Sequence, residues 1–235
     1  MQIIPISSGS KGNCYLVTVP GSAILIDCGI PIKSIKENLW HRGFNLSDID
    51  GCLVSHEHGD HVKAAQALAD MGVDIYTSAG TAEAAGLHGH RIHTLNLMIG
   101  VPIKSFYVYP YLVEHDAKEP LAFSVSCKDT NERLLYITDA MYFRYNISGV
   151  THLMIEANYD PEIIAENAEN GRIDMARAKR TVNSHMSLET AKLTVERMDK
   201  SRLREIWLLH LSNDNAANDF KERIQEVSGV PVYVA

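Results

Sequence analysis

The 235-residue chain lacks several features that would place it in a specialised class of protein. No uncharged apolar run approaches the roughly 18 to 20 residues that a membrane-spanning helix needs. The first residues, MQIIPISSGSKGN, contain no basic region followed by a long apolar one, so a secretory leader is not indicated. We therefore expect a soluble, unexported, cytoplasmic protein without a membrane partner.

Cysteine is scarce and is not arranged in pairs. None of the four cysteines belongs to a Cys-x-x-Cys motif, which argues against both a cysteine zinc site and a disulfide framework. We expect small, reduced core thiols at these four positions: Cys14, Cys28, Cys52 and Cys127.

An excess of positive charge is also absent. The 22 basic and 29 acidic residues give a net charge of −7, which argues against broad, non-specific attraction to nucleic acid but leaves room for a local basic groove. The chain is 46% hydrophobic and has no long linker, low-complexity tract or internal repeat. We therefore predict a single domain over residues 1–235.

Short apolar runs separated by turn residues predict a mixed α/β protein. The expected strands are 2–6, 14–19, 23–27, 49–55, 73–77, several between 91 and 111 joined at Pro102 and Pro110, 121–128, 133–138, 152–156, 203–210 and 230–234. The expected helices are 31–43, 60–71, 79–87, one from Pro161, one from Ser187 and one around 217–227.

The strongest chemical signal is a dense group of metal-ligand residues between the strand 49–55 and the helix that follows it. Four such residues occupy six positions: His56, His58, Asp60 and His61. Three further ligand-type residues each follow an apolar run that would direct them to one sheet edge: His115, Asp139 and His210. Because imidazole and carboxylate are the donors, the sequence favours zinc, manganese or iron without selecting among them.

This arrangement resembles the signature of the metallo-β-lactamase superfamily, His-x-His-x-Asp-His followed by a distant His, Asp and His. The resemblance extends over essentially the whole chain, and it implies a four-layer αββα sandwich and two divalent ions that share a hydroxide. It assigns one ion to His56, His58 and His115, the other to Asp60, His61 and His210, and both ions to Asp139. The catalytic residues that we predict are Asp60 and His185.

Shorter segments are similar to the YycJ-like branch of this superfamily, which is implicated in DNA exonuclease activity. They are residues 8–14, 156–160 and 210–215, together with His185-Met186-Ser187, which also resembles a segment of ribonuclease Z. In those nucleases the corresponding histidine faces the scissile phosphate, so the resemblance implies that His185 is a general acid. A helix-capping surface histidine is the alternative interpretation.

A basic segment precedes His185. Residues 172–180 carry four positive charges and one negative charge, and such a patch can guide a phosphate backbone; a solvated helix face is the alternative. The predicted substrate-binding residues are His185, Asn158, Arg177, Lys179 and Arg180.

Other candidates carry less weight. His88, His90 and His93 form His-x-His-x-x-His, but they have no nearby carboxylate and flank a glycine turn, so we do not assign them to a metal. Glu57 is interpreted either as a hydrogen-bond partner of a ligand imidazole or as a solvated loop carboxylate.

The predicted function is a metal-dependent phosphodiesterase, a nuclease of the DNA exonuclease type. DNA is favoured over RNA as the substrate, and a homodimer is left open. Only 23 residues separate His115 from Asp139, which leaves no space for the projecting arm with which ribonuclease Z grips transfer RNA. The alternatives are a hydrolase of a small ester, thioester or lactone on the same scaffold, and a binding module that has lost its chemistry.

Overall fold

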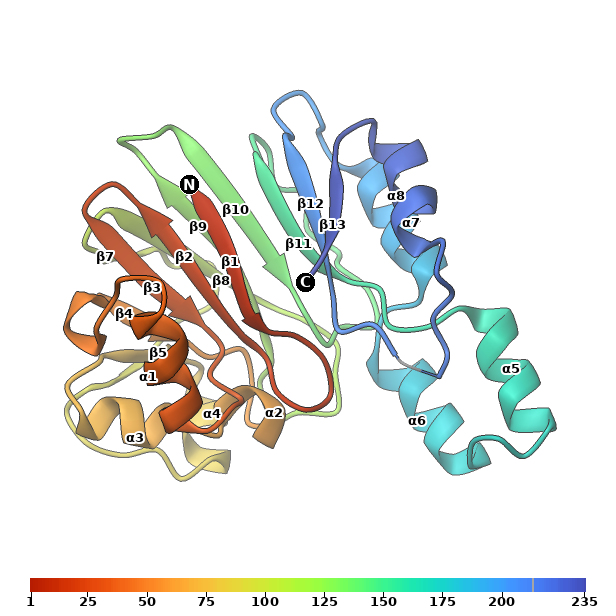
Figure 1. The fold of residues 1–235 in the computed structure, drawn as a ribbon, viewed down its shortest axis with the longest axis horizontal. Coiled ribbons are helices and arrows are strands. Elements are labelled where there is room, and N and C mark those ends of the chain that lie inside the picture. Colours follow the sequence, from red (N-terminus) through yellow and green to blue (C-terminus); the bar gives the residue numbers. More distant parts are fainter. Residues whose placement is uncertain (213) are drawn as a thin grey trace. The chain divides into compact units, whose positions relative to one another are not determined.

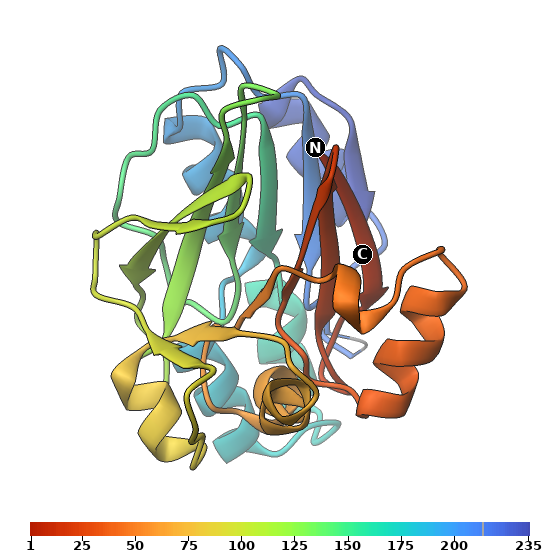
Figure 2. The same cartoon turned by 90° about the vertical axis from the view of Figure 1, so that its left-hand side faces the viewer.

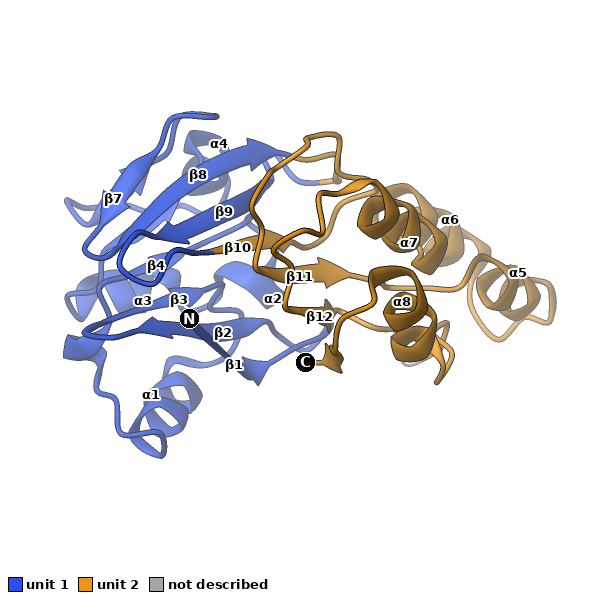
Figure 3. Cartoon of the chain, turned by 90° about the horizontal axis from the view of Figure 1, so that it is seen from above, with its two compact units in different colours: residues 1–112, 117–132 blue, residues 113–116, 133–235 orange. Residues whose placement is uncertain are grey.

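The computed structural model describes residues 1–212 and 214–235, which divide into two compact units (Figure 3). Unit 1 contains residues 1–112 and 117–132, and unit 2 contains residues 113–116 and 133–235. Among the described residues, no helix is long and apolar enough to cross a membrane. The single-domain organisation stays a prediction.

Unit 1 contains a six-stranded sheet in which β1 to β6 follow one another in chain order. The strands are β1 (Gln2–Ser7), β2 (Cys14–Val19), β3 (Ser22–Ile26), β4 (Gly51–Leu53), β5 (Ile75–Thr77) and β6 (Ile92–Thr94). The first three strands are antiparallel, and β3 to β6 are parallel. Because β3 and β4 run side by side in the same direction, the residues that follow them reach the same edge of the sheet.

Helices α1 (Ile32–Trp40) and α3 (Ala65–Asp70) pack on this sheet, and Figure 2 shows α1, in orange, beside the red strands β1 to β3. The other helices of unit 1 are α2 (Gly59–Val62), α4 (Ala79–Ala84) and a 3₁₀ turn at Leu46–Asp48. The expected single helix over 60–71 is wrong. The backbone N–H of Ala64 donates to the carbonyl of Cys28, 2.9 Å away, and this bond coincides with the break between α2 and α3.

Three further strands of unit 1 form an antiparallel ladder: β7 (Val101–Ile103), β8 (Phe106–Leu112) and β9 (Leu121–Cys127). The expected strand junctions at Pro102 and Pro110 are wrong, because both prolines lie inside strands. The turn between β7 and β8 falls at Lys104, whose φ is 50°. Pro102 is tolerated in the short strand β7, and the carbonyl of Pro110 accepts a hydrogen bond from Met98, so neither position depends on a proline N–H.

Unit 2 is built around the parallel strands β10 (Glu132–Ile137), β11 (His152–Glu156), β12 (Glu205–Leu209) and β13 (Val232–Val234). Most of their side chains are buried. Helices α7 (Leu188–Arg197) and α8 (Phe220–Ser228) lie side by side next to these strands (Figure 1). Ser187 caps α7, as the sequence predicts, by accepting a hydrogen bond from the Thr190 amide.

A helical hairpin, α5 (Pro161–Glu169) and α6 (Met175–Ser184), extends from the strands of unit 2 (Figure 1). Gly171, with φ of 67°, follows the end of α5, and Asp174 caps α6 by accepting hydrogen bonds from two backbone amides. Tyr159, Ile164, Ile173 and Ala178 form a small apolar cluster inside the hairpin. The sequence predicts one helix from Pro161. The structure has a second helix, α6, which ends directly before His185.

Candidate metal centre

The histidine-rich loop of unit 1 leaves the end of β4 and enters α2. His58 occupies the N-terminal cap of α2, so Asp60 and His61 lie in its first turn. His56 is buried, and its Nε2 lies 3.1 Å from Nδ1 of His58. His61 Nε2 lies 3.6 Å from Oδ2 of Asp60. The predicted ligands of this loop are therefore gathered into one cluster within unit 1.

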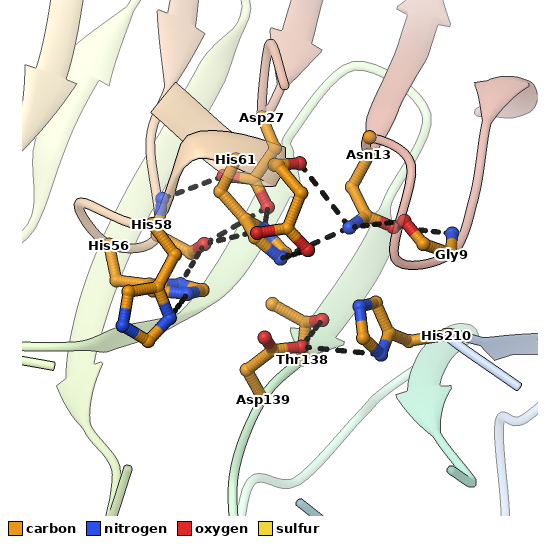
Figure 4. A network of polar contacts seen from close by, with 12 residues as sticks. Gly9, Asn13, Asp27, His56, His58, His61, Thr138, Asp139 and His210 are labelled. Atoms are coloured by element: carbon orange, nitrogen blue, oxygen red, sulfur yellow. Dashed lines mark hydrogen bonds and ion pairs between the residues drawn. The ribbon is translucent and has the colours of Figure 1, made fainter. Parts of the chain in front are cut away.

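Asp27, at the end of β3, holds this cluster in place (Figure 4). Its Oδ1 accepts the backbone N–H of Ser55 at 2.8 Å, and its Oδ2 lies 2.7 Å from Nδ1 of His61. Both Asp27 and His61 are fully buried. A carboxylate at Nδ1 fixes the orientation of the imidazole and leaves Nε2 as its ligand atom. The sequence interpretation missed Asp27, although an apolar run at a strand end precedes it as one precedes Asp139.

Asn13 supports the same loop from the glycine-containing turn after β1. Its backbone N–H donates to the carbonyl of Asp60 at 2.7 Å, and its Nδ2 lies 3.1 Å from Nε2 of His61 (Figure 4). Gly29 packs on the same carbonyl so closely that a Cβ added there would lie 1.7 Å from the oxygen. The turn that the sequence presents as a strand connection therefore also fixes the backbone of a predicted ligand.

In unit 2, Asp139 lies between two histidines. Its Oδ2 is 3.7 Å from Nε2 of His115. Its Oδ1 is 3.9 Å from Nδ1 of His210, a contact that Figure 4 shows. His115 Nδ1 lies 2.6 Å from the Ser184 carbonyl, which leaves Nε2 as the ligand atom. Burial lowers the pKa of His115, which favours the neutral ring that a metal ligand requires.

His185, at the C-terminal cap of α6, contacts a carboxylate that the sequence interpretation did not single out. Its Nδ1 lies 2.7 Å from Oε1 of Glu156, which is fully buried at the end of β11. Oε2 of Glu156 accepts the backbone N–H groups of Ala140 and Met186 at 3.2 and 3.1 Å. Glu156 therefore ties His185 to the segment that follows Asp139.

The charges of this pair support each other. Burial alone would raise the pKa of Glu156, but its contacts with His185 and His210 lower it below the ordinary value. Burial alone would lower the pKa of His185, but the charge of Glu156 and their hydrogen bond raise it. One ligand-type atom from each of Asp139, Glu156, His185 and His210 lies within 4.8 Å of the others.

The predicted substrate residues occupy different settings. Asn158 is buried, and its Nδ2 donates to the carbonyl of His210 at 2.8 Å and lies 3.0 Å from the Nδ1 of that residue. Arg177, Lys179 and Arg180 are exposed on α6. Arg180 Nε donates to Asp116 at 2.8 Å, whereas Arg177 lies 3.9 Å from Asp214. Their roles toward a substrate stay predictions.

The residues that carried less weight in the sequence interpretation are not part of a cluster of metal donors among the described residues. Among the described residues, no group of three donors contains His88, His90 or His93, and His93 stacks on Tyr76 at 4.9 Å between ring centroids. Glu57 Oε1 accepts the backbone N–H of Lys118 at 2.6 Å. Glu57 therefore binds the backbone of another loop, a contact that neither interpretation of this residue considered.

Three residues at strand ends share an unusual backbone conformation. Asp27, Asp139 and His210 have φ values of 55°, 43° and 53°, in the left-handed region that most L-residues avoid. Each follows a strand that belongs to a parallel pair: β3, β10 and β12 respectively. Strained backbone of this kind is concentrated at functional sites.

Several known proteins are similar to this chain in sequence. Residues 8–100 match the family model described as "Metallo-beta-lactamase superfamily". The exodeoxyribonuclease YycJ of Bacillus anthracis is 29% identical over 222 residues, which cover 89% of this chain and 82% of YycJ. The exodeoxyribonuclease WalJ of Streptococcus pneumoniae serotype 2 (strain D39) is 27% identical over 89% of this chain and 81% of WalJ. The chain is thus similar to the metallo-β-lactamase superfamily over residues 8–100 and to two exodeoxyribonucleases over most of its length.

The fold of this superfamily is also found in a solved structure, the metallo-β-lactamase fold protein YhfI of Bacillus subtilis. The two chains superpose with a TM-score of 0.74 at 17% identity, over 99% of this chain and 95% of YhfI. The predicted mixed α/β metallo-β-lactamase fold is confirmed by this similarity and by the two sheets and helices of the chain. Together, the matched family and the named relatives support a metal-dependent hydrolase.

Proposed function

We propose that the chain is a phosphodiesterase that cleaves nucleic acid, with DNA favoured over RNA, at a dinuclear metal centre. The observation that carries the proposal is the position of Asp139, each of whose carboxylate oxygens faces a different histidine. That position suits a carboxylate shared between two ions. In the proposed centre, His56, His58 and His115 would hold one ion, Asp60, His61 and His210 would hold the other, and Asp139 would contribute to both.

The donor chemistry fits divalent ions of the zinc, manganese and iron type. All seven proposed ligands offer nitrogen or oxygen, and the four cysteines are free and buried. The ring nitrogens opposite the proposed ligand atoms of His61 and His115 have defined partners, Asp27 and the Ser184 carbonyl. When bound, such ions activate water near neutral pH and stabilise charge on the phosphoryl oxygens. Free thiols also suit the reducing cytoplasm that we propose as the location.

His185 is proposed to protonate the leaving oxygen. With Nδ1 hydrogen-bonded to Glu156, Nε2 is the atom that remains to donate a proton, and the His185 side chain is 19% exposed. Glu156 acts as a positioning residue because it sets the ring orientation and the tautomer of His185. We propose that Asp60 is both a metal ligand and a catalytic residue.

The exposed basic side chains of α6 are proposed to bind the phosphate backbone. They lie on the helix that ends at His185, so a strand that binds along α6 is led toward the proposed general acid. Arg177 and Arg180 have acidic neighbours, Asp214 and Asp116, which a phosphate must displace. Lys179 is therefore expected to contribute more to phosphate binding than either Arg177 or Arg180.

The test combines metal analysis with a substrate panel. Purified protein loaded with Mn²⁺ or Zn²⁺ receives 5′-phosphorylated single-stranded and duplex DNA and RNA, a model phosphodiester and a thioester. Wild type is expected to bind two ions per chain and to cut DNA fastest. His58→Ala should lose most of this activity, whereas His41→Ala, an exposed histidine at the end of α1, should keep it.

Two results would contradict the proposal. Turnover of the thioester above that of every phosphodiester would identify another hydrolase, and His185→Ala would then have little effect. A metal content near zero in the wild type would remove the dinuclear centre. Light scattering of the same sample tests whether the chain forms the homodimer that the sequence leaves open.

A further inference from the structure

A cavity of about 500 Å³ in unit 2 lies outside the residues assigned so far. One wall is the segment 142–147, which follows Asp139, and the opposite wall is one face of α7. Leu135 and Leu153, from β10 and β11, also line the cavity. Its volume lies within the range of about 300 to 1,000 Å³ that is usual for small-molecule sites, so the cavity can hold a group the size of a nucleotide.

The cavity walls carry aromatic rings and cations and no carboxylate. Tyr142 is 44% exposed, and the rings of Phe143 and Tyr145 lie 5.3 Å apart between centroids. The guanidinium of Arg144 lies 5.8 Å from the Tyr145 ring centroid. Arg197, on the α7 wall, forms no ion pair with any described residue. Aromatic rings beside arginine favour a flat, polarisable group that carries negative charge nearby.

Two largely apolar side chains are exposed at this cavity, and no described residue covers them. Leu193 of α7 is 48% exposed, and Tyr142 contributes a similar exposed fraction from the other wall. Thr190 and Thr194 add hydroxyl groups along the same helix face. The two hydroxyls already bond Ser187 and the Thr190 carbonyl, and Arg144 bonds Glu114, so Arg197 is the charged group of the lining to which an occupant can bring a partner. A nucleobase with its phosphate therefore suits the lining better than a purely apolar occupant.

The cavity is also fixed to the segments that carry proposed ligands of unit 2. The backbone N–H of Met141 donates to the carbonyl of Glu114 at 3.0 Å, and Arg144 Nη2 donates to Oε1 of Glu114 at 2.9 Å. Glu114 directly precedes His115, and Tyr142 is three residues beyond Asp139. These hydrogen bonds to Glu114 therefore fix the position of the aromatic segment 142–147 relative to His115 and Asp139, two residues of the proposed metal centre.

We propose that this cavity binds one unpaired nucleotide of the substrate, with the base against Tyr142 and the phosphate near Arg197. The inference rests on the proposed nuclease function and specifies its substrate as a single-stranded end. A base in a duplex is already stacked and paired, so it would have to leave the helix before it enters the cavity. Single-stranded nucleic acid should accordingly bind more tightly than duplex of the same sequence.

Fluorescence anisotropy of full-length protein in EDTA measures this binding without cleavage. The probe is a labelled, 5′-phosphorylated deoxyoligonucleotide of mixed sequence, together with a series in which each base in turn is replaced by an abasic site. We expect Tyr142→Ala to weaken binding about 5-fold or more, and one abasic position to weaken binding to the wild type by a similar factor. The matched control is Tyr233→Ala, because Tyr233 is 42% exposed on β13 of the same unit.

A second variant, at an exposed position, tests the site without disturbing the fold. Arg197→Gln alters an exposed charge on α7 and should reduce binding and lessen its dependence on salt concentration. If the wild type binds and cuts the oligonucleotide while Tyr142→Ala behaves like Tyr233→Ala, the nucleotide site is refuted and the nuclease function stands. If the wild type neither binds nor cuts any oligonucleotide, both proposals fall.

Discussion

The two units assemble their ligand-type side chains in different ways. In unit 1, four such residues come from six consecutive positions of one loop, and buried partners at Asp27 and Asn13 hold that loop. In unit 2, His115, Asp139 and His210 come from three separate loops that follow or join strands, and Glu156 links the segments after Asp139 and before Met186. A compact loop reveals its chemistry in the sequence, whereas a dispersed cluster depends on strand order.

Removing the charge of Glu156 should have the largest effect on turnover. Glu156→Gln keeps the size of the side chain but takes away the anion that supports protonated His185, so we expect kcat to fall about 100-fold or more with little change in KM. Initial rates on single-stranded DNA measure this. Glu205→Gln, at a partly buried glutamate that bonds Trp207 on β12, is the control. A loss of bound metal in Glu156→Gln would show instead that Glu156 is a ligand.

The corresponding change in unit 1 should act on metal affinity rather than on turnover. Asp27→Asn removes the charge at Nδ1 of His61, and loss of such a partner typically lowers metal affinity about 10- to 100-fold. Competition with a chelator, followed by calorimetry or absorbance, measures the change. Asp50→Asn serves as the control because Asp50 bonds Ser22 in the same unit. Equal metal affinities of Asp27→Asn and Asp50→Asn would contradict a specific role of Asp27 in supporting the ligand loop of unit 1.

Crowding the loop of unit 1 should cost stability. Gly29→Ala places a methyl group 1.7 Å from the Asp60 carbonyl position, so the backbone has to move, and we expect about 1 to 3 kcal/mol of lost stability. Urea unfolding monitored by circular dichroism measures the loss. Gly59→Ala, where nothing lies within 4 Å of the added atom, should change stability far less. Similar midpoints for both variants would mean that the loop adapts freely.

The smallest expected effect concerns the hairpin of unit 2. Asp160 caps α5 by accepting the amide of Glu162 at 2.9 Å and also bonds Arg223, so Asp160→Ala should cost about 1 kcal/mol or slightly more. Asp174→Ala removes only the cap of α6 and should cost less. Thermal unfolding of both variants orders the two losses. The reverse order would mean that the Arg223 contact adds nothing.

The signals that the sequence carried best were local ones. The spacing of His56, His58 and His61 identified their loop before any fold was known, and the cap at Ser187 marked the start of α7. The break at Ala64 could not be predicted in the same way, because it depends on a hydrogen bond to Cys28 from a strand end 36 residues earlier. Periodicity describes a helix but contains no information about a distant carbonyl that competes for its amide.

The supporting carboxylates were missed for a related reason. Asp27 follows a strand, as Asp139 does, and Glu156 is the last residue of one, but no neighbouring residue in the sequence distinguishes a partner of histidine from a turn carboxylate. Their roles depend on contacts with His61 and His185, which are 34 and 29 positions away. A search for acidic residues at the ends of all expected strands would have found both candidates, although it would not have assigned their partners.

The left-handed backbone at Asp139 and His210 limits how the centre can be redesigned. Aspartate and histidine are among the few L-residues that are enriched in this conformation, whereas cysteine is not. The chain geometry thus selects oxygen and nitrogen donors before any ion arrives. An engineer who wants a thiolate-rich, softer centre at these positions would have to rebuild the strand ends as well as replace the side chains.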